Sequence, residues 1–285
     1  MLKYRLIFGT LMTLAFIGIV LLNAYFDDYF SVYLTPDEPL HGTLVIILVA
    51  LLMVPGLFEL SKLATVKGIK ILLPVSIPVS ILLITRSYRP SVFMFGDVFV
   101  FFLLAFTIMA CFLYHRIRYG FSGVLVNCGA ACFSILYLGA LGAFVPATYI
   151  VFGPWHLLML VFVVKACDIG AYTAGQLFGK HKFSPVISPK KTWEGMAGGV
   201  ILAVIVAVGF AIFCDIMAWR LGVIFGIAFA FLGQLGDLAE SMLKRDAETK
   251  DASNNVPGFG GILDVADSIL VTAPFGYLFF SLLGQ

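Results

Sequence analysis

Long apolar runs alternate with short polar segments along the whole chain. A helix that crosses about 30 Å of hydrocarbon needs roughly 20 mostly apolar residues, and nine runs approach that length. The third run is the shortest, and its Pro74 and Pro78 indicate either a kinked span or a re-entrant one. The pattern predicts an all-α fold, a polytopic membrane helical bundle with about nine transmembrane helices. The predicted spans are residues 6–25, 43–60, 71–84, 98–114, 123–143, 155–178, 195–213, 221–235 and 262–283.

Composition excludes most alternatives to a membrane protein. Of the 285 residues, 61% are hydrophobic and only 12% are charged, and the mean hydropathy is +1.04. Soluble chains have about 45–50% apolar and about 25% charged residues, so a water-soluble enzyme and a disordered chain are excluded. The net charge of +2 is too small to indicate a nucleic-acid partner.

The distribution of Lys and Arg predicts the orientation. If the N-terminus lies in the cytoplasm, most of the 18 basic residues fall in inside segments, as the positive-inside rule requires. Nine spans would then place the C-terminus outside. Arg86 and Arg89 are the exception, since they fall in a predicted outside loop. The first apolar run resembles a signal peptide but is longer than the usual core of one, so we expect a retained span.

Two carboxylate-bearing helix faces meet the same membrane interface. On a helix, residues three, four and seven apart share a face, so each of the two sets below lies on one side of its helix. Oxygen ligands without His or Cys suit Mg²⁺ better than Zn²⁺, so the faces predict a divalent-cation site. Solvated helix ends with local salt bridges are the alternative. The sets are Asp237, Glu240, Ser241 and Lys244, and Asp264, Asp267 and Ser268.

Other polar residues near this interface suggest anion binding. Lys165 and Asp168 lie at membrane depth, where ionisable residues usually serve function, although a buried ion pair could serve packing alone. The segment 188–195 carries hydroxyls and paired lysines that suit phosphate, or that mark a positive-inside flank which holds anionic lipid. Gly260 and Gly261 precede a helix, whose N-terminus favours an anion. The phosphate-binding candidates in the first segment are Ser188, Lys190, Lys191 and Thr192.

The C-terminal half resembles the phosphatidate cytidylyltransferase (CDP-diacylglycerol synthase) family. The family signature has the form S-x-L-K-R-x4-K-D, a Pro-Gly-His-Gly-Gly turn and D-R-x-D, and it matches Ser241–Asp251 and then Pro257–Asp267. The resemblance covers roughly residues 165–270. Two positions differ, because Phe259 replaces the usual His and Val265 replaces the usual Arg.

This resemblance implies CTP-dependent cytidylyl transfer to phosphatidic acid, which yields CDP-diacylglycerol and pyrophosphate during phospholipid biosynthesis. Together with the predicted spans, it suggests residues 1–150 as N-terminal transmembrane helices and residues 151–285 as a catalytic transmembrane region, within one integrated bundle. The expected site is on the cytoplasmic side of a bacterial inner membrane and uses one or two Mg²⁺ ions. The implied catalytic residues are Asp237, Asp264, Lys244 and Asp267; the metal ligands are Asp237, Asp264 and Glu240; the substrate-binding residues are Ser188, Lys190, Lys191, Thr192, Arg245, Lys250, Gly260, Gly261 and Asp168.

Two other interpretations stay open at this point. A transporter or ion pathway would explain the intramembrane charges as a relay. A weakened relative that binds lipid or nucleotide without turnover would explain Phe259 and Val265. The small-residue face at 195–199 permits close helix packing, either within the chain or in a homodimer.

Overall fold

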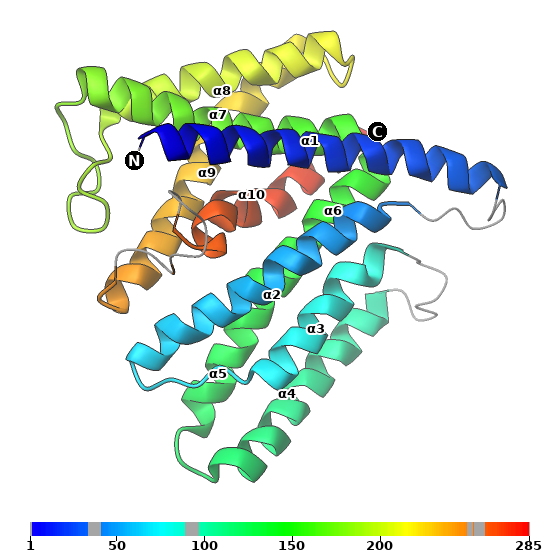
Figure 1. Cartoon of the computed structure of the whole chain (residues 1–285), viewed down its shortest axis with the longest axis vertical. Coiled ribbons are helices and arrows are strands. Elements are labelled where there is room, and N and C mark those ends of the chain that lie inside the picture. Colours follow the sequence, from blue (N-terminus) through cyan, green and yellow to red (C-terminus); the bar gives the residue numbers. More distant parts are fainter. Residues whose placement is uncertain (1, 34–40, 89–96, 250–252, 254–259, 285) are drawn as a thin grey trace. The chain divides into compact units, whose positions relative to one another are not determined.

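The computed structural model describes residues 2–33, 41–88, 97–249, 253 and 260–284 (Figure 1). Within these ranges the regular secondary structure is helical, and the isolated bridge residues are Gly260 and the pair Lys182 and Thr192. The helices are α1 (Leu2–Tyr33), α2 (Thr43–Val66), α3 (Leu73–Thr85), η1 (Arg86–Tyr88), α4 (Asp97–Tyr119), α5 (Val124–Ser134), η2 (Ile135–Ala140), α6 (Leu141–Phe152), α7 (Pro154–Phe178), α8 (Trp193–Phe213), α9 (Trp219–Asp246) and α10 (Ile262–Leu282).

The predicted polytopic architecture is confirmed. Eight helical segments in the described ranges are long and apolar enough to cross a membrane, and α3 is a shorter apolar helix of 13 residues. Several predicted ends come too early, two of them most clearly. The run expected to end at residue 235 continues in α9 to Asp246. The helix that begins at Val124 was expected to end at residue 143, but α5, η2 and α6 continue to Phe152 with Pro146 inside. The helix ends at Gly153, whose φ of 89° few other residues adopt, and Pro154 then starts α7.

The chain divides into two compact units. The first unit contains residues 1–150 and 251–265, and the second contains residues 151–250 and 266–285, so the boundary falls within α10. Each unit has its own set of packed helices.

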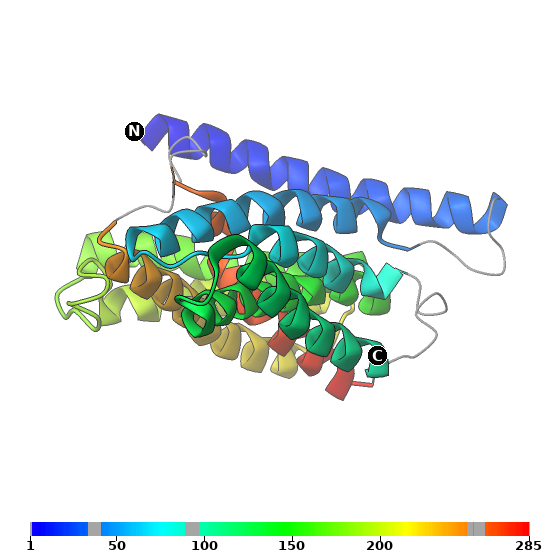
Figure 2. The same ribbon diagram turned by 90° about the horizontal axis from the view of Figure 1, so that it is seen from below.

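In the first unit, α2 and α4 run parallel to each other, and α3 connects them by running in the opposite direction (Figures 1 and 2). The Nζ of Lys70, just beyond α2, lies 4.4 Å from the ring centroid of Tyr119 at the end of α4, so α2 and α4 end at the same side. Leu72, before the start of α3, packs with Cys111 in the second half of α4, whereas Leu83, near the end of α3, packs with Leu103 in the first half of α4. The segment α3 therefore runs antiparallel to α4.

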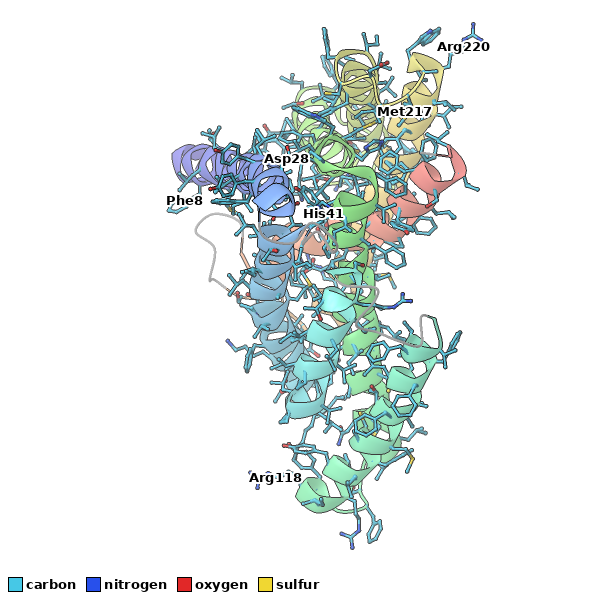
Figure 3. The ribbon with its side chains drawn as sticks, turned by 90° about the vertical axis from the view of Figure 1, so that its right-hand side faces the viewer. Phe8, Asp28, His41, Arg118, Met217 and Arg220 are labelled. Carbon is cyan, nitrogen blue, oxygen red and sulfur yellow. The ribbon has the colours of Figure 1, made fainter. Side chains whose placement is uncertain are left out.

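The opposite end of the first unit is closed by polar groups. The carboxylate of Asp27 accepts hydrogen bonds from the Asn23 amide at 2.7 Å, the Gly42 N–H at 3.0 Å and the Tyr149 hydroxyl at 3.0 Å. Figure 3 shows His41 and Asp28 at this end of the unit and Arg118 at the other. Asp28 and Arg118 thus lie toward opposite ends of this unit.

In the second unit, α7 and α8 pack closely through glycines and run side by side (Figure 1). A Cβ on Gly198 would lie 2.2 Å from the Cβ of Ala174, and one on Gly199 would lie 2.9 Å from the carbonyl oxygen of Cys167. The small-residue face at 195–199, which we considered for a homodimer, therefore packs against α7 of the same chain.

Candidate functional site

Three carboxylates of the second unit form an acidic group. Asp237 and Glu240 lie on α9 and Asp267 lies on α10, and one oxygen of each lies within 4.8 Å of the others. Gly236 brings the two helices together, because a Cβ there would lie 3.0 Å from both the carbonyl oxygen of Asp267 and the Cα of Ser268. Glu240 and Asp267 are buried. The donors are all oxygens, so the group fits a hard divalent cation such as Mg²⁺.

Two lysines border this acidic group. The Nζ of Lys191 lies 2.7 Å from Oδ2 of Asp237, and the Lys191 side chain is only 13% exposed. Lys244 forms an ion pair with Glu240 one helical turn earlier. Holding three carboxylates close together, two of them buried, is costly unless positive charge accompanies them, and these two ammonium groups supply part of that charge. Each of the two lysines is also a natural ligand for phosphate.

A second polar group continues from α7. The Nζ of Lys165 lies 3.4 Å from Oδ2 of Asp168, so these residues form the ion pair that the sequence left open as an alternative, and each side chain is 33% exposed. The side-chain amide of Gln234 on α9 donates to Oδ1 of Asp168 at 3.3 Å, and the carbonyl oxygen of Gln234 accepts from Lys191 at 3.4 Å. Gln234 thus connects the Asp168 pair with the lysine beside the acidic group.

The predicted phosphate ligands in the loop between α7 and α8 have different environments. Thr192 is the N-cap of α8, and its Oγ1 accepts from the Gly195 N–H at 3.1 Å. Ser188 closes a turn, since its carbonyl oxygen accepts from the Lys191 N–H at 3.1 Å. Lys190 is exposed. Arg245 reaches the loop from α9, with its Nε–H donating to the Ile187 carbonyl at 3.2 Å.

The start of α10 lies in the first unit, and side-chain carboxylates accept hydrogen bonds from its N–H groups. The Gly261 N–H donates to Oδ2 of Asp264 at 2.6 Å. The Ile262 and Leu263 N–H groups donate to Glu59 of α2 at 3.1 and 2.9 Å. We expected this helix end to favour an anion, and the anions that it binds in the structure are carboxylates of the chain itself.

The acidic group thus contains two of the three predicted metal ligands, together with Asp267, which was predicted as a catalytic residue. Asp237 and Glu240 lie together as expected, but the third member of the acidic group is Asp267 rather than Asp264. Asp264 caps its own helix in the first unit. That Asp264 and Asp237 bind the same cation stays a prediction. Lys250 and Phe259 lie outside the described residues, whereas Gly260, with φ of 101°, and Val265 lie within them.

Sequence reasoning missed two residues of these networks, Gln234 and Glu59. Glu59 had a visible signal, because a carboxylate within the apolar run 43–60 is unusual and indicates a role. Gln234 lies inside the quoted stretch that contains Asp237, but an uncharged amide in a span gives a weaker signal. In both cases the partner is distant in sequence.

Comparison with known proteins agrees with these features. The family model described as "Cytidylyltransferase family" matches residues 3–283, which is nearly the whole chain.

Individual relatives match over shorter stretches. The chain is 41% identical over 143 residues to a phosphatidate cytidylyltransferase of Haemophilus influenzae, covering 46% of this chain and 49% of that protein. It is 47% identical over 124 residues to one of Staphylococcus saprophyticus (43% and 47% covered) and 39% identical over 132 residues to one of Bacillus subtilis (46% and 49% covered). The chain spans about half the length of the curated relatives that it matches.

Proposed function

The chain belongs to the cytidylyltransferase family, and we propose that it is a phosphatidate cytidylyltransferase, a membrane enzyme that transfers the cytidylyl group of CTP to phosphatidic acid. The relatives at 39–47% identity carry that name. The observation that carries the proposal is the group of three carboxylates from two membrane helices, with a lysine beside two of them. Such a group can hold a cation and two phosphates at once.

The proposed reaction makes one bond and breaks one. A phosphate oxygen of phosphatidic acid attacks the α-phosphorus of CTP, and the bond from that phosphorus to the oxygen bridging to the β-phosphate breaks. The electron pair leaves on pyrophosphate, and CDP-diacylglycerol is the lipid product. A phosphate monoester is already mostly dianionic near neutral pH, so no dedicated base is needed to activate the attacking oxygen. A phenylalanine at position 259 is compatible with this chemistry.

Asp237, Glu240 and Asp267 would hold Mg²⁺, and Asp264 stays a candidate ligand. When bound, the ion would neutralise charge on the triphosphate and on the departing pyrophosphate. The carboxylates fix where that charge is neutralised, because Gly236 keeps α9 against α10.

Lysines and the arginine would bind the anionic reactants. Lys191 and Lys244 lie beside the carboxylates and would bind the triphosphate, with Arg245 at the loop edge. Lys190 is exposed and would contact a phosphate at the mouth of the site. Holding two anions in reacting geometry accounts for much of the rate enhancement that such an enzyme needs. Lys250, Ser188, Gly260, Gly261 and Asp168 stay candidate substrate contacts, and Thr192 would act through the cap of α8.

We place the enzyme in a bacterial inner membrane with its site facing the cytoplasm. Lys191, Lys244 and Arg245 belong to segments that the positive-inside rule assigns to the cytoplasm, where CTP is available. The acyl chains of the lipid would remain in the bilayer beside the apolar helices.

The test uses purified full-length protein with CTP labelled on the α-phosphate, Mg²⁺ and phosphatidate in mixed micelles. We expect labelled CDP-diacylglycerol and one pyrophosphate for each lipid formed. Nucleotide binding without lipid product would support the weakened relative instead. If the protein neither binds nucleotide nor forms product, the proposal is overturned and transport is left as the alternative.

A further inference from the structure

Glu59 is a buried carboxylate in an apolar helix. It lies on α2 within the span Thr43–Val66, and its side chain and backbone together are only 1% exposed. An ionised carboxylate at such a place costs several kcal/mol unless donors surround it. The structure supplies such donors from a part of the chain about 200 residues later.

Three described donors converge on this carboxylate. The Ser253 hydroxyl donates to Oε1 at 2.6 Å, the Ile262 N–H donates to Oε1 at 3.1 Å, and the Leu263 N–H donates to Oε2 at 2.9 Å. Two of these donors are the first N–H groups of α10, which have no partner within the helix. The positive end of the helix dipole further favours a negative charge here.

Gly261 fits the same arrangement. A Cβ on Gly261 would lie 2.5 Å from Oε2 of Glu59 and 3.1 Å from Oδ2 of Asp264. The Gly261 N–H donates to Asp264, so the two carboxylates together bind the first three N–H groups at the start of α10. A side chain at position 261 would push Glu59 away from this helix end.

We propose that Glu59 is a positioning residue of the active site: it fixes the N-terminus of α10 and thereby sets the carboxylates that this helix carries. Asp264 lies in the first turn of α10, and Asp267 follows three residues later on the same face. The inference rests on the proposed function for its catalytic consequence. The anchoring itself does not depend on that function.

The first test measures anchoring without any reaction. Hydrogen exchange with mass spectrometry on the full-length protein compares the wild type with Glu59→Gln, which keeps the size but removes the charge and turns one acceptor into a donor. We expect the peptide that contains Ile262 and Leu263 to exchange at least about tenfold faster in the variant. Asp215→Asn is the matched control, because Asp215 is exposed in the α8–α9 connection, and Asn tolerates its φ of 51°. Unchanged exchange in Glu59→Gln would overturn the proposal.

The second test measures the catalytic consequence. We expect Glu59→Gln to lower kcat about 10- to 100-fold and to raise the Mg²⁺ concentration for half-maximal activity, because supporting contacts of a metal site commonly have effects of this size. Glu59→Asp should recover part of kcat. A normal kcat and Mg²⁺ dependence with faster exchange would leave Glu59 as a structural anchor and overturn its positioning role.

The anchoring by Glu59 and the proposed function can fail separately. A wild type that makes no CDP-diacylglycerol would contradict the proposed function, while the exchange measurement would still decide the anchoring. If Glu59→Gln fails to accumulate in membranes, Ser253→Ala removes one described donor, and unchanged exchange at Ile262 and Leu263 in that variant would overturn the proposal.

Discussion

Lys191 and Asp237 form a close ion pair, with 2.7 Å between Nζ and Oδ2. The lysine comes from the loop before α8 and the aspartate from α9, so the pair joins two segments of the second unit at the acidic group. A cation that binds Asp237 would compete with this pair and release the ammonium group toward a phosphate. The two residues therefore connect metal binding with nucleotide binding in the proposed mechanism.

The structure separates the roles of two adjacent lysines. Lys191→Ala should lower kcat/KM for CTP about 10- to 100-fold, which corresponds to the 1.5–3 kcal/mol of a charge-assisted hydrogen bond. Lys190→Ala should have a much smaller effect, because its side chain is exposed. Steady-state kinetics over a range of CTP concentrations measures both. Equal losses in the two variants would contradict this assignment and favour a diffuse positive flank.

Asp267, predicted from sequence as a catalytic residue and placed by the structure in the acidic group, should be essential. Asp267→Asn keeps the volume of the side chain and removes its charge, so turnover should fall by about two orders of magnitude or more. Asp215→Asn makes the same chemical change at an exposed site and should retain wild-type turnover. Both rates are measured after the purified variants show the helical content of the wild type. Near-normal turnover of Asp267→Asn would remove this residue from the metal site.

Much of the fold could be predicted from sequence because it follows from local physics. Apolar runs near 20 residues predicted the spans, and the i, i+3 spacing placed Asp237 and Glu240 on one face of α9. Thr192 was interpreted as a phosphate ligand, although a hydroxyl directly before a helix is typical of an N-cap, and a cap is what the structure shows.

Contacts between distant segments could not be predicted in the same way. Asp267 joins Asp237 because Gly236 lets α9 and α10 approach, and that approach depends on the packing of both helices. Likewise, Glu59 binds N–H groups about 200 residues further along the chain. The periodicity within one helix does not contain such information: it places Asp264 and Asp267 on one face of α10 but does not say which of them lies beside Asp237.

Metal removal should abolish turnover reversibly. An excess of EDTA should stop CDP-diacylglycerol formation, and added Mg²⁺ should restore it. The three carboxylates are negative like the pyrophosphate that forms, so a bound cation is needed to neutralise that charge. Zn²⁺ should restore little activity at an oxygen-only site. Isothermal titration with Mg²⁺ alone should show binding that is weakened in Asp237→Asn. Full turnover in EDTA would contradict the metal mechanism.

The number of crossings sets the side of the C-terminus. Since α2 and α4 end at the same side of the first unit, α3 returns the chain between them, and we expect it to count as a ninth crossing. Nine crossings would place the two termini on opposite sides of the membrane. Alkaline phosphatase fused after Gln285 should therefore be active in a bacterial host, and a fluorescent protein fused at the same place should be dark. The same reporters inserted in the loop before α8 should give the opposite result. An inactive phosphatase after Gln285 would reduce the count to eight.

Glycine packing between α7 and α8 offers a stability test with a control in the same helix. A Cβ on Gly198 would lie 2.2 Å from the Cβ of Ala174, so Gly198→Ala should cost about 1–3 kcal/mol through overpacking. Gly209 has nothing within 4 Å of its ideal Cβ, and Gly209→Ala should be neutral or stabilising by up to about 1 kcal/mol. Thermal unfolding in detergent should show a lower Tm for the first variant alone. Light scattering on the same samples should show no change in oligomeric state, since this face packs within the chain. A loss of dimers in Gly198→Ala, with Tm unchanged, would assign the face to an interface between subunits.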